Sequence, residues 1–429
     1  MNQSIRRREF LGTTLGGIAS AVALGTSGWV AKAAESDASA TVGGAAFDPD
    51  TLFLTWQRDP TTTMTVQWVA PEIAADTTVY CGPLTEALSL RAKTINKPFP
   101  DTEMKVHRAE LTGLEPGTEY QFQIGTNSQI YRFRTMPAKA TNTIQFVSGG
   151  DCGTGEHAIA NNILAAKQEP YFALIGGDLA YDDGRKPGTF NKFLRNYRAH
   201  MVDPSGRLIP MITCIGNHDV DGGFVRESGG MRSKSPHYLS VFDGLFHEKT
   251  FGVLDIGDYL SLVLLDTDHL APVAGEQTDW LARTLADRQD RPHLIAVNHI
   301  ACYPSVRPMF VDEGRTRGEE QRLHWCPLYE KYKVDVVLEH HDHAFKRTHP
   351  LTDGLKDKNG VLYLGDGSWG KLRAPNSPEE RPYLAVTSEA FHISVQRLEG
   401  RHRYHVALDD TGRVMDVAMT KNKRPSRRG

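Results

Sequence analysis

Five short groups of chemically capable side chains stand along the central and C-terminal parts of this 429-residue chain. Each group contains residues that bind metal ions or transfer protons, and each follows an apolar run. The groups are Gly150-Asp151-Cys152-Gly153, Gly177-Asp178-Leu179-Ala180-Tyr181, Gly216-Asn217-His218-Asp219, Asn298-His299 and His340-His341-Asp342-His343. One such group alone is most often a turn, but five in order are hard to attribute to coincidence.

The side chains in these groups suit two metal ions held close together. Asp151 and Asp178 supply anionic oxygen, which a hard trivalent ion prefers and which can bridge two ions. Histidines supply neutral nitrogen for a softer divalent ion, and Asn217 adds an oxygen without further negative charge. A phenol with a pKa of about 10 is deprotonated only beside a strongly acidic cation. Tyr181 therefore indicates Fe(III).

The apolar runs predict the elements that position these residues. Strands are expected at 144–148, 171–175, 208–215, 259–265, 293–297 and 334–338, and a helical pattern lies within 275–289. Strands that alternate with helices predict a layered α/β domain, here 141–420, in which sites follow the strand ends. We expect the rings of His341 and His343 to point the same way, because side chains alternate along a strand.

Residues 46–137 show a different rhythm of short strands and turns. Thr63 to Trp68 alternates with period two, and Tyr120, Phe122 and Ile124 share one face after the turn 111–117. The sequence of this turn, with the tyrosine that follows it, resembles that found in fibronectin type III sandwich domains. No chemical constellation occurs here, so an all-β packing or positioning domain is predicted.

The first 33 residues are read as an export signal. Arg6, Arg7 and Arg8 precede a weakly apolar stretch, 11–30, and the small-x-small site at 31–33 follows. This pattern resembles a bacterial twin-arginine signal, which implies the twin-arginine translocation machinery as a partner and a periplasmic or secreted product. A retained membrane anchor is the alternative; no stable span is expected after cleavage. Residues 34–45 read as a linker.

The charge balance excludes some functions. The whole chain carries a net charge of -3, and residues 34–419 hold 40 basic against 51 acidic side chains, a net of -11. An acidic body gives no case for nucleic-acid binding, which requires a basic surface. The basic residues at 421–429 are read as a frayed tail. Five cysteines in a chain of this length are no disulfide framework.

Taken together, the five groups closely resemble those of the purple acid phosphatases, within the calcineurin-like metallophosphoesterases. The resemblance implies a β-sandwich flanked by helices, preceded by the fibronectin-like domain. It implies Fe(III) held by Asp151, Asp178, Tyr181 and His343, with Asp178 bridging. The second ion, Zn(II), Mn(II) or Fe(II), would be held by Asp178, Asn217, His299 and His341. Most relatives outside the purple group have a histidine at the position of Gly153 and lack the tyrosine.

The sequence departs from the family's pattern around the substrate. His340 stands where the family usually has glycine; it reaches the phosphate pocket or merely packs. Some relatives place substrate-binding histidines shortly after the fourth group, but 300–310 contains none. Tyr303 and Arg307 are the candidates to replace them. Cys302 and Cys326 flank a loop, with no firm prediction of pairing.

The resemblance implies hydrolysis of phosphate monoesters by a metal-bound hydroxide, without a phosphoenzyme. His218, next to Asn217, is expected to face the phosphate and to stabilise charge or protonate the leaving oxygen, with Asp219 as its orienter. The alternatives are an exported phosphodiesterase or nucleotidase on the same scaffold, an exported Fe-dependent alkaline phosphatase, and a degenerate binding protein. The partner is a small phosphate ester; the oligomeric state is left open.

Overall fold

The structure is a computed structural model that describes residues 47–72, 76–246, 248–309 and 318–424. The predicted export signal at 1–33 and the linker at 34–45 lie outside the described residues. Within the described ranges, no helix combines the length and the apolar character needed to cross a membrane.

The N-terminal region folds into two antiparallel sheets of four strands each. In one the order is β1 (Phe53–Thr55), β2 (Thr63–Pro71), β6 (Met104–Thr112) and β5 (Ile95–Pro98). In the other it is β4 (Leu90–Ala92), β3 (Val79–Pro83), β7 (Glu119–Ile124) and β8 (Tyr131–Arg134). The Tyr120 hydroxyl accepts a hydrogen bond from the Glu115 backbone N–H at 2.8 Å and closes the turn before β7.

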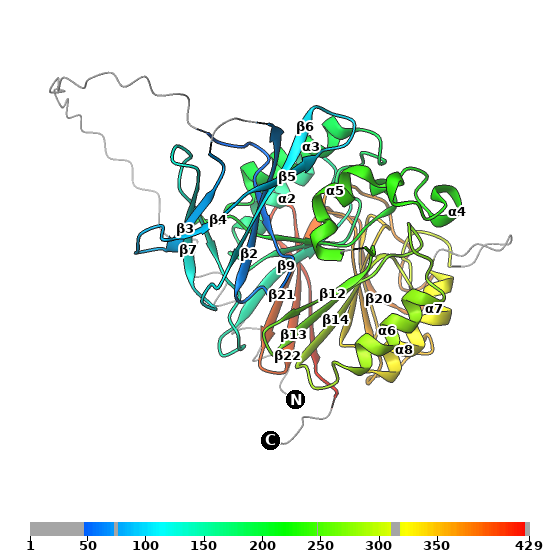
Figure 1. Cartoon of the computed structure of the whole chain (residues 1–429). Helices are drawn as coiled ribbons and strands as arrows, with labels where there is room; N and C mark the ends of the chain where they lie inside the picture. Colours follow the sequence, from blue (N-terminus) through cyan, green and yellow to red (C-terminus); the bar gives the residue numbers. More distant parts are fainter. Residues whose placement is uncertain (1–46, 73–75, 247, 310–317, 425–429) are drawn as a thin grey trace, which may run out of the picture. The chain divides into compact units, whose positions relative to one another are not determined.

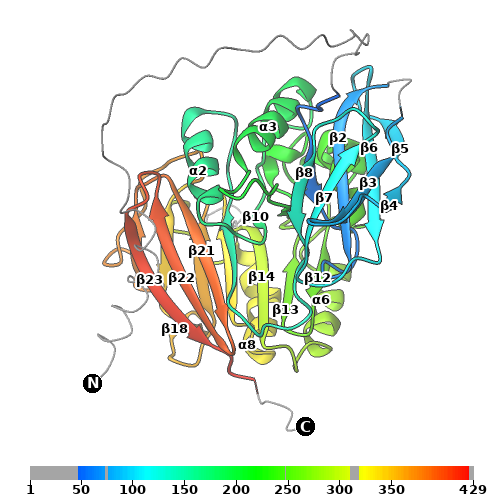
Figure 2. The same cartoon turned by 90° about the vertical axis from the view of Figure 1, so that its left-hand side faces the viewer.

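A six-stranded sheet begins the second region and carries the first three ligand groups. Its order is β11 (Met211–Thr213), β10 (Ala173–Ile175), β9 (Ile144–Gly149), β21 (His392–Glu399), β22 (His402–Asp409) and β23 (Val414–Lys421). β9, β10 and β11 run parallel, so their carboxyl ends meet at one edge. β21 to β23 continue the sheet as antiparallel neighbours (Figure 2).

A seven-stranded sheet carries the other two groups. Its order is β12 (Gly252–Ile256), β13 (Leu260–Leu264), β14 (His293–Ile300), β15 (Val336–His340), β19 (Leu362–Asp366), β16 (Phe345–Thr348) and β20 (Leu384–Ser388). β13, β14, β15 and β19 are parallel. Helices α6 (Glu276–Ala286), α7 (Glu319–His324) and α8 (Cys326–Lys331) lie on one side of it (Figure 1). Leu281, Leu285 and Tyr329 pack there on strand residues such as Leu294 and Val337.

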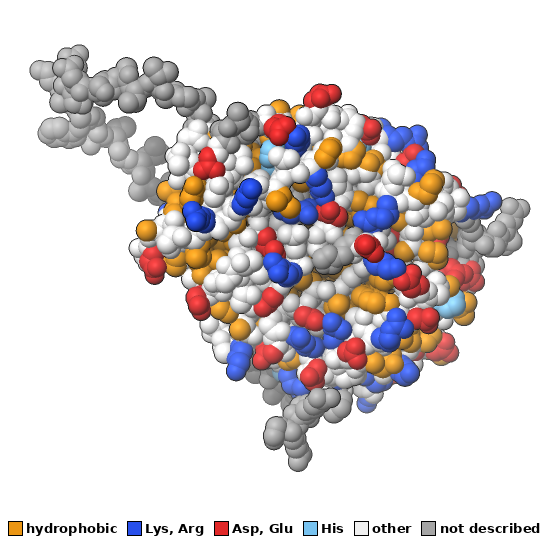
Figure 3. Space-filling model, viewed as in Figure 1, with side chains coloured by type: hydrophobic (Ala, Val, Ile, Leu, Met, Phe, Trp, Pro, Cys, Tyr) orange, Lys and Arg blue, Asp and Glu red, His pale blue; other side chains and the backbone are white. Residues whose placement is uncertain are grey.

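The remaining elements are short or cover the site edges. They are α2 (Glu156–Ala166), α3 (Pro187–His200), η1 (Asn217–Asp219), α4 (Val225–Ser228), η2 (Arg232–Lys234), α5 (Pro236–Phe246), β17 (Leu351–Thr352) and β18 (Leu355–Lys356). The fold class expected from the sequence, an all-β region followed by layered sheets with flanking helices, is confirmed. On the face shown in Figure 3, acidic and basic side chains are interspersed.

The described end of the chain is anchored rather than frayed, which corrects the interpretation of residues 421–424. Arg424 is buried, and its Nη2 lies 2.7 Å from Asp335 Oδ2. Arg403, also buried, pairs with Asp335 Oδ1 at 3.0 Å and donates from Nη1 to His293 Nδ1 at 2.8 Å. Burial and the charges of Arg403 and Arg424 lower the pKa of His293 to about 2.

This cluster predicts a loss of stability in acid. His293 stays neutral when folded, while the unfolded chain binds a proton below pH ~6.5, its usual pKa. The stability is therefore intact above pH ~6.5 and falls with acidification by about 1.4 kcal/mol per pH unit. His293→Asn should remove about 3 kcal/mol of the loss between pH ~6.5 and ~4.5. Urea unfolding of parent and variant at the two pH values tests this; parallel pH slopes would contradict it.

Candidate metal centre

The seven predicted metal ligands meet where the ends of the two sheets of the second region face each other. Four come from the six-stranded sheet: Asp151 follows β9, Asp178 and Tyr181 follow β10, and Asn217 begins η1 after β11. His299 lies in β14, and His341 and His343 follow β15. Two donor groups result, Asp151–Asp178–His343 and Asp178–His299–His341, each with ligand atoms within 4.8 Å of one another. They share Asp178, as two bridged ions require.

The first group includes the tyrosine. Asp151 Oδ1 lies 3.0 Å from His343 Nε2, and the Tyr181 hydroxyl lies 3.2 Å from Asp151 Oδ1 and 3.0 Å from His343 Nε2. Asp151 and Asp178 are fully buried. A carboxylate pair, a phenol and an imidazole within these distances form a donor set rich in anionic oxygen, which favours a trivalent ion.

The second group is richer in nitrogen. His299 Nε2 lies 3.3 Å from Asp178 Oδ1, 3.2 Å from Asn217 Oδ1 and 3.2 Å from His341 Nδ1. His299 Nδ1 is 2.8 Å from the Gly176 carbonyl oxygen and donates to it, which leaves the Nε2 lone pair facing the group. Two imidazoles, an amide oxygen and the shared carboxylate suit a divalent ion.

The backbone is strained at most of these ligands. Positive φ angles of 57°, 52°, 60°, 70° and 61° occur at Asp151, Asp178, Tyr181, His341 and His343. Non-glycine residues rarely adopt this left-handed region, and such strain persists where the surrounding structure requires it. The expectation that strand alternation aims His341 and His343 is wrong, because both lie in a turn past the end of β15. His299, by contrast, lies at a β-bulge in β14, between Asn298 and Ile300.

The electrostatics of the site fit cations. Burial and the neighbouring Asp151 carboxylate raise the pKa of Asp178 to about 7. Burial and the charges of Asp151 and Asp178 raise the pKa of Tyr181 far above its usual value. Asp178 Oδ2 is buried and has no hydrogen-bond partner among the described residues. An orphaned carboxylate oxygen between two sets of ligand atoms is the expected mark of a bridging metal ligand.

His218 lies at the rim, and its orienting residue is not the one expected. His218 Nδ1 is 2.7 Å from Asp183 Oδ1, the His218 ring is 40% exposed, and it lies 4.4 Å from the Tyr181 ring. Asp219 instead accepts the backbone N–H groups of Asp178, Leu179 and Gly216 and is buried. The assignment of Asp219 as orienter is therefore wrong, since it holds the turn. In the sequence, the signal that could have identified the orienting residue is the position of Asp183, a carboxylate five residues after Asp178.

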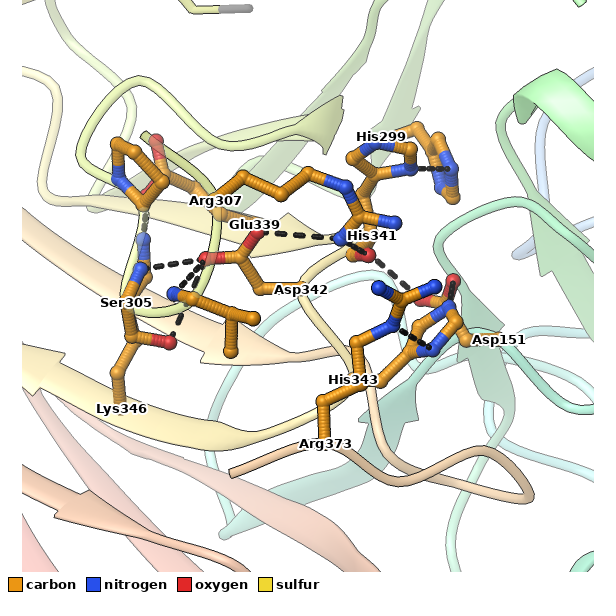
Figure 4. A network of polar contacts seen from close by, with 12 residues as sticks. Asp151, His299, Ser305, Arg307, Glu339, His341, Asp342, His343, Lys346 and Arg373 are labelled. Carbon is orange, nitrogen blue, oxygen red and sulfur yellow. Dashed lines mark hydrogen bonds and ion pairs between the residues drawn. The ribbon is translucent and has the colours of Figure 1, made fainter. Parts of the chain in front are cut away.

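A polar network holds the His341–His343 turn (Figure 4). Asp342 Oδ2 accepts the Ser305 and Val306 N–H groups, and Arg307 Nη1 donates to the His341 carbonyl oxygen. Arg307 Nη1 also lies 3.3 Å from Asp342 Oδ1. The predicted substrate role of Arg307 is thus replaced by a positioning role in the structure.

Tyr303 is not a rim residue. Its side chain is buried in the hydrophobic core beneath the loop, and its ring lies 4.6 Å from Tyr363 and 5.6 Å from Tyr383. The proposal that Tyr303 binds substrate is therefore wrong.

His340 packs beneath the site. The ring is buried, and its Nδ1 lies 2.7 Å from the Asn298 carbonyl oxygen. It occupies the space beside two glycines: a Cβ at Gly176 would lie 1.9 Å from His340 Cε1, and one at Gly150 would lie 2.8 Å from Cδ2. Of the two alternatives left open, the structure shows packing, so His340 is not a substrate-binding residue.

This packing predicts that a substitution at His340 will compensate for the destabilising effect of one at Gly176. Gly176→Ala places a methyl group inside the His340 ring and should destabilise the fold by about 3 kcal/mol, the upper range for overpacking. His340→Gly in the same chain should restore most of the loss. Gly188→Ala, with no atom near its added Cβ, is the control and should be neutral or slightly stabilising. Urea unfolding measures all three; an unrescued double variant would contradict the contact.

Comparisons with known proteins agree with this geometry. Residues 49–135 match the model of the purple acid phosphatase N-terminal domain, and residues 148–345 match that of the calcineurin-like phosphoesterases. Purple acid phosphatase 21 of Arabidopsis thaliana is 24% identical over 64% of this chain and 62% of its own length. Acid phosphatase type 7 of Mus musculus is 24% identical over 86% of this chain and 90% of its own.

The fold is also found in a solved structure. A purple acid phosphatase from yellow lupin (Lupinus luteus) seeds has a TM-score of 0.71 and 19% identity, with 87% of this chain and 74% of that one covered. Two matched domain models in tandem, the shared fold and the paired donor groups lead to one conclusion: the chain belongs to the purple acid phosphatase family of dinuclear calcineurin-like metallophosphoesterases.

Proposed function

We propose that the protein is an exported acid phosphatase that hydrolyses phosphate monoesters at a centre of Fe(III) and a divalent ion. One observation carries the proposal. Two buried donor groups share Asp178, and Tyr181 belongs to the group that has His343 as its single histidine. The family's printed names, purple acid phosphatase and acid phosphatase, support the reaction class.

We divide the ligands between the two ions by the type of donor atom. Asp151, Asp178, Tyr181 and His343 would hold Fe(III), and Asp178, Asn217, His299 and His341 would hold Zn(II), Mn(II) or Fe(II). When bound, the ions supply Lewis-acid polarisation of phosphate oxygens and lower the pKa of coordinated water. The phenol of Tyr181 within this group supports iron, because only a strongly acidic cation would hold it as a phenolate.

His218 and Asp183 supply the proton chemistry. The Asp183 carboxylate fixes Nδ1 of the ring, so Nε2 is the nitrogen free to act at the rim. Burial alone would raise the pKa of Asp183, but its hydrogen bonds with His218 and Lys186 lower it, which keeps it anionic. His218 would donate a proton to the leaving alkoxide oxygen, while Asp219 holds the Asp178 turn in place.

Metal analysis combined with a hydrolysis panel tests the proposal. The purified protein should contain about two metal ions per chain, one of them iron, and should absorb visible light through the tyrosinate–Fe(III) pair. Aryl and alkyl phosphate monoesters should be hydrolysed faster than bis-aryl diesters, most rapidly at acidic pH. A colourless, iron-free protein that is fully active would refute the Fe(III) assignment, and a preference for diesters would favour the phosphodiesterase alternative.

The export part of the proposal rests on residues 1–33 alone. Arg7 and Arg8, followed by Glu9, Phe10 and Leu11, form the twin-arginine pattern Arg-Arg-x-Phe-Leu. Arg7→Lys with Arg8→Lys should retain the protein inside cells, while the parent should reach the periplasm or medium. Fractionation followed by immunoblotting measures this, and equal export of both would refute the signal.

A further inference from the structure

Two basic side chains stand at the tyrosine side of the metal centre without an acidic partner. Lys371 and Arg373 lie in the loop between β19 and β20. The Lys371 ammonium is 4.2 Å from the centroid of the Tyr181 ring, and Arg373 Nε donates to His343 Nδ1 at 3.2 Å. In the described part of the chain, neither forms an ion pair with a carboxylate.

Other cations near these loops are already engaged. Arg307 donates to the His341 carbonyl oxygen, Lys186 pairs with Asp183, and Arg185 pairs with Asp221. Residues 34–419 are acidic overall, with 40 basic against 51 acidic side chains. Two unpaired positive charges on one loop are therefore a local exception, and the whole-chain charge will not draw an anion to this place.

The residues around Lys371 leave a defined space for its side chain. Gly153, which follows Asp151 by two residues, leaves room for it: a Cβ there would lie 3.2 Å from Lys371 Cε. A side chain at position 153 would crowd Lys371 on this side. The ammonium is thus held beside a proposed iron ligand, with the lysine stem packed rather than free in solvent.

Arg373 has side-chain donors that its contact with His343 does not use. Figure 4 shows its guanidinium beside His343. While Nε donates to His343, the exposed guanidinium keeps four N–H donors on its two Nη atoms with no carboxylate to satisfy them, and planar donors of this kind suit phosphate oxygens.

From these contacts we infer that Lys371 and Arg373 bind a second anionic group of the substrate, so that diphosphates are preferred over simple monoesters. The inference rests on the proposed function of the same centre. Water adds to the terminal phosphorus, the bond from that phosphorus to the bridging oxygen breaks, and the bridging oxygen leaves with the second phosphate and takes up a proton. No oxidant or further reactant is needed.

A ratio of two substrates tests the inference. We expect kcat/KM for inorganic diphosphate, divided by that for phenyl phosphate, to fall about 30-fold in the Lys371→Ala, Arg373→Ala double variant, as expected for lost charge-assisted hydrogen bonds. Lys371→Arg, which keeps the charge, should retain the ratio within about three-fold. Lys358→Ala, an exposed lysine on the turn before β19, is the matched control and should leave both substrates unchanged. An unchanged ratio in the double variant would overturn the inference.

A binding experiment separates this inference from the proposed function. Calorimetry on the metal-loaded protein should show that methylenediphosphonate binds more tightly than methylphosphonate, and that the double variant loses about 30-fold of this preference. Absence of phenyl phosphate hydrolysis by the loaded parent would refute the phosphatase proposal alone. Equal affinity ratios in parent and double variant would refute the role of Lys371 and Arg373 alone.

Discussion

Replacing Asp178 with asparagine should remove both metal ions and lower kcat by at least about a thousand-fold. Asp178 is the only residue common to the two donor groups, and its Oδ2 has no hydrogen-bond partner among the described residues. An amide keeps the volume and an acceptor for the His218 N–H, which Oδ1 binds at 2.7 Å, but it cannot bridge two cations. Metal stabilisation of several kcal/mol in the transition state corresponds to that loss in rate.

Metal content by mass spectrometry and hydrolysis of an aryl phosphate measure the effect. Asp353→Asn, an exposed position in the turn between β17 and β18, is the matched control and should keep both ions. The metal-free Asp178→Asn protein should unfold at the same urea concentration as the metal-free parent, because the change is isosteric. If the variant kept two ions and full turnover, Asp178 would not be the bridge.

Replacing His218 with alanine should lower kcat by about 100- to 1,000-fold for alkyl phosphates while both ions stay bound. His218 touches neither donor group through its ring nitrogens; its Nδ1 faces Asp183 and its side chain is 40% exposed. A proton donor matters most for a poor leaving group. The loss should therefore be under about ten-fold for p-nitrophenyl phosphate, whose leaving group needs no proton.

Asp183→Asn should give a smaller loss, about ten-fold on alkyl esters, because the ring keeps its place but loses the acceptor that orients it. The chain offers a matched pair of controls: His157 and Asp410 form another partly exposed imidazole–carboxylate contact, at 3.1 Å. His157→Ala and Asp410→Asn should change nothing on either ester. Equal losses on alkyl and nitrophenyl esters in His218→Ala would exclude the proton-donor role.

Much of the fold could be predicted because its signals are local. The apolar runs at 144–148, 293–297 and 334–338 became β9, β14 and β15, and the helical pattern within 275–289 became α6. Burial of an apolar strand or of one helix face depends mainly on the residues of that segment, so the pattern is readable without the partner. The ligand groups were readable for the same reason, since each stands directly after such a run.

The errors came from contacts between distant segments. Asp219 and Asp183 are both plausible partners of His218 in sequence, and only the folded turn shows that Asp219 faces three backbone N–H groups. His340 and Tyr303 stand next to chemically suggestive residues, yet they pack against Gly176 and Tyr363, each more than fifty residues away in the chain. Packing of this kind depends on how side chains from distant segments fit together. The residues of one segment do not reveal that fit.

The sequence by itself therefore determined which side chains are available to hold two metals, because metal choice follows donor chemistry and Tyr181 is informative wherever it lies. The tertiary structure decided how they are shared. Asp151, Asp178 and Asn217 come from one sheet and His299, His341 and His343 from another, and a bulge and left-handed turns aim them at common points. Only the packing of two sheets brings these ends together, and it also places Asp183, Lys371 and Arg373 beside them.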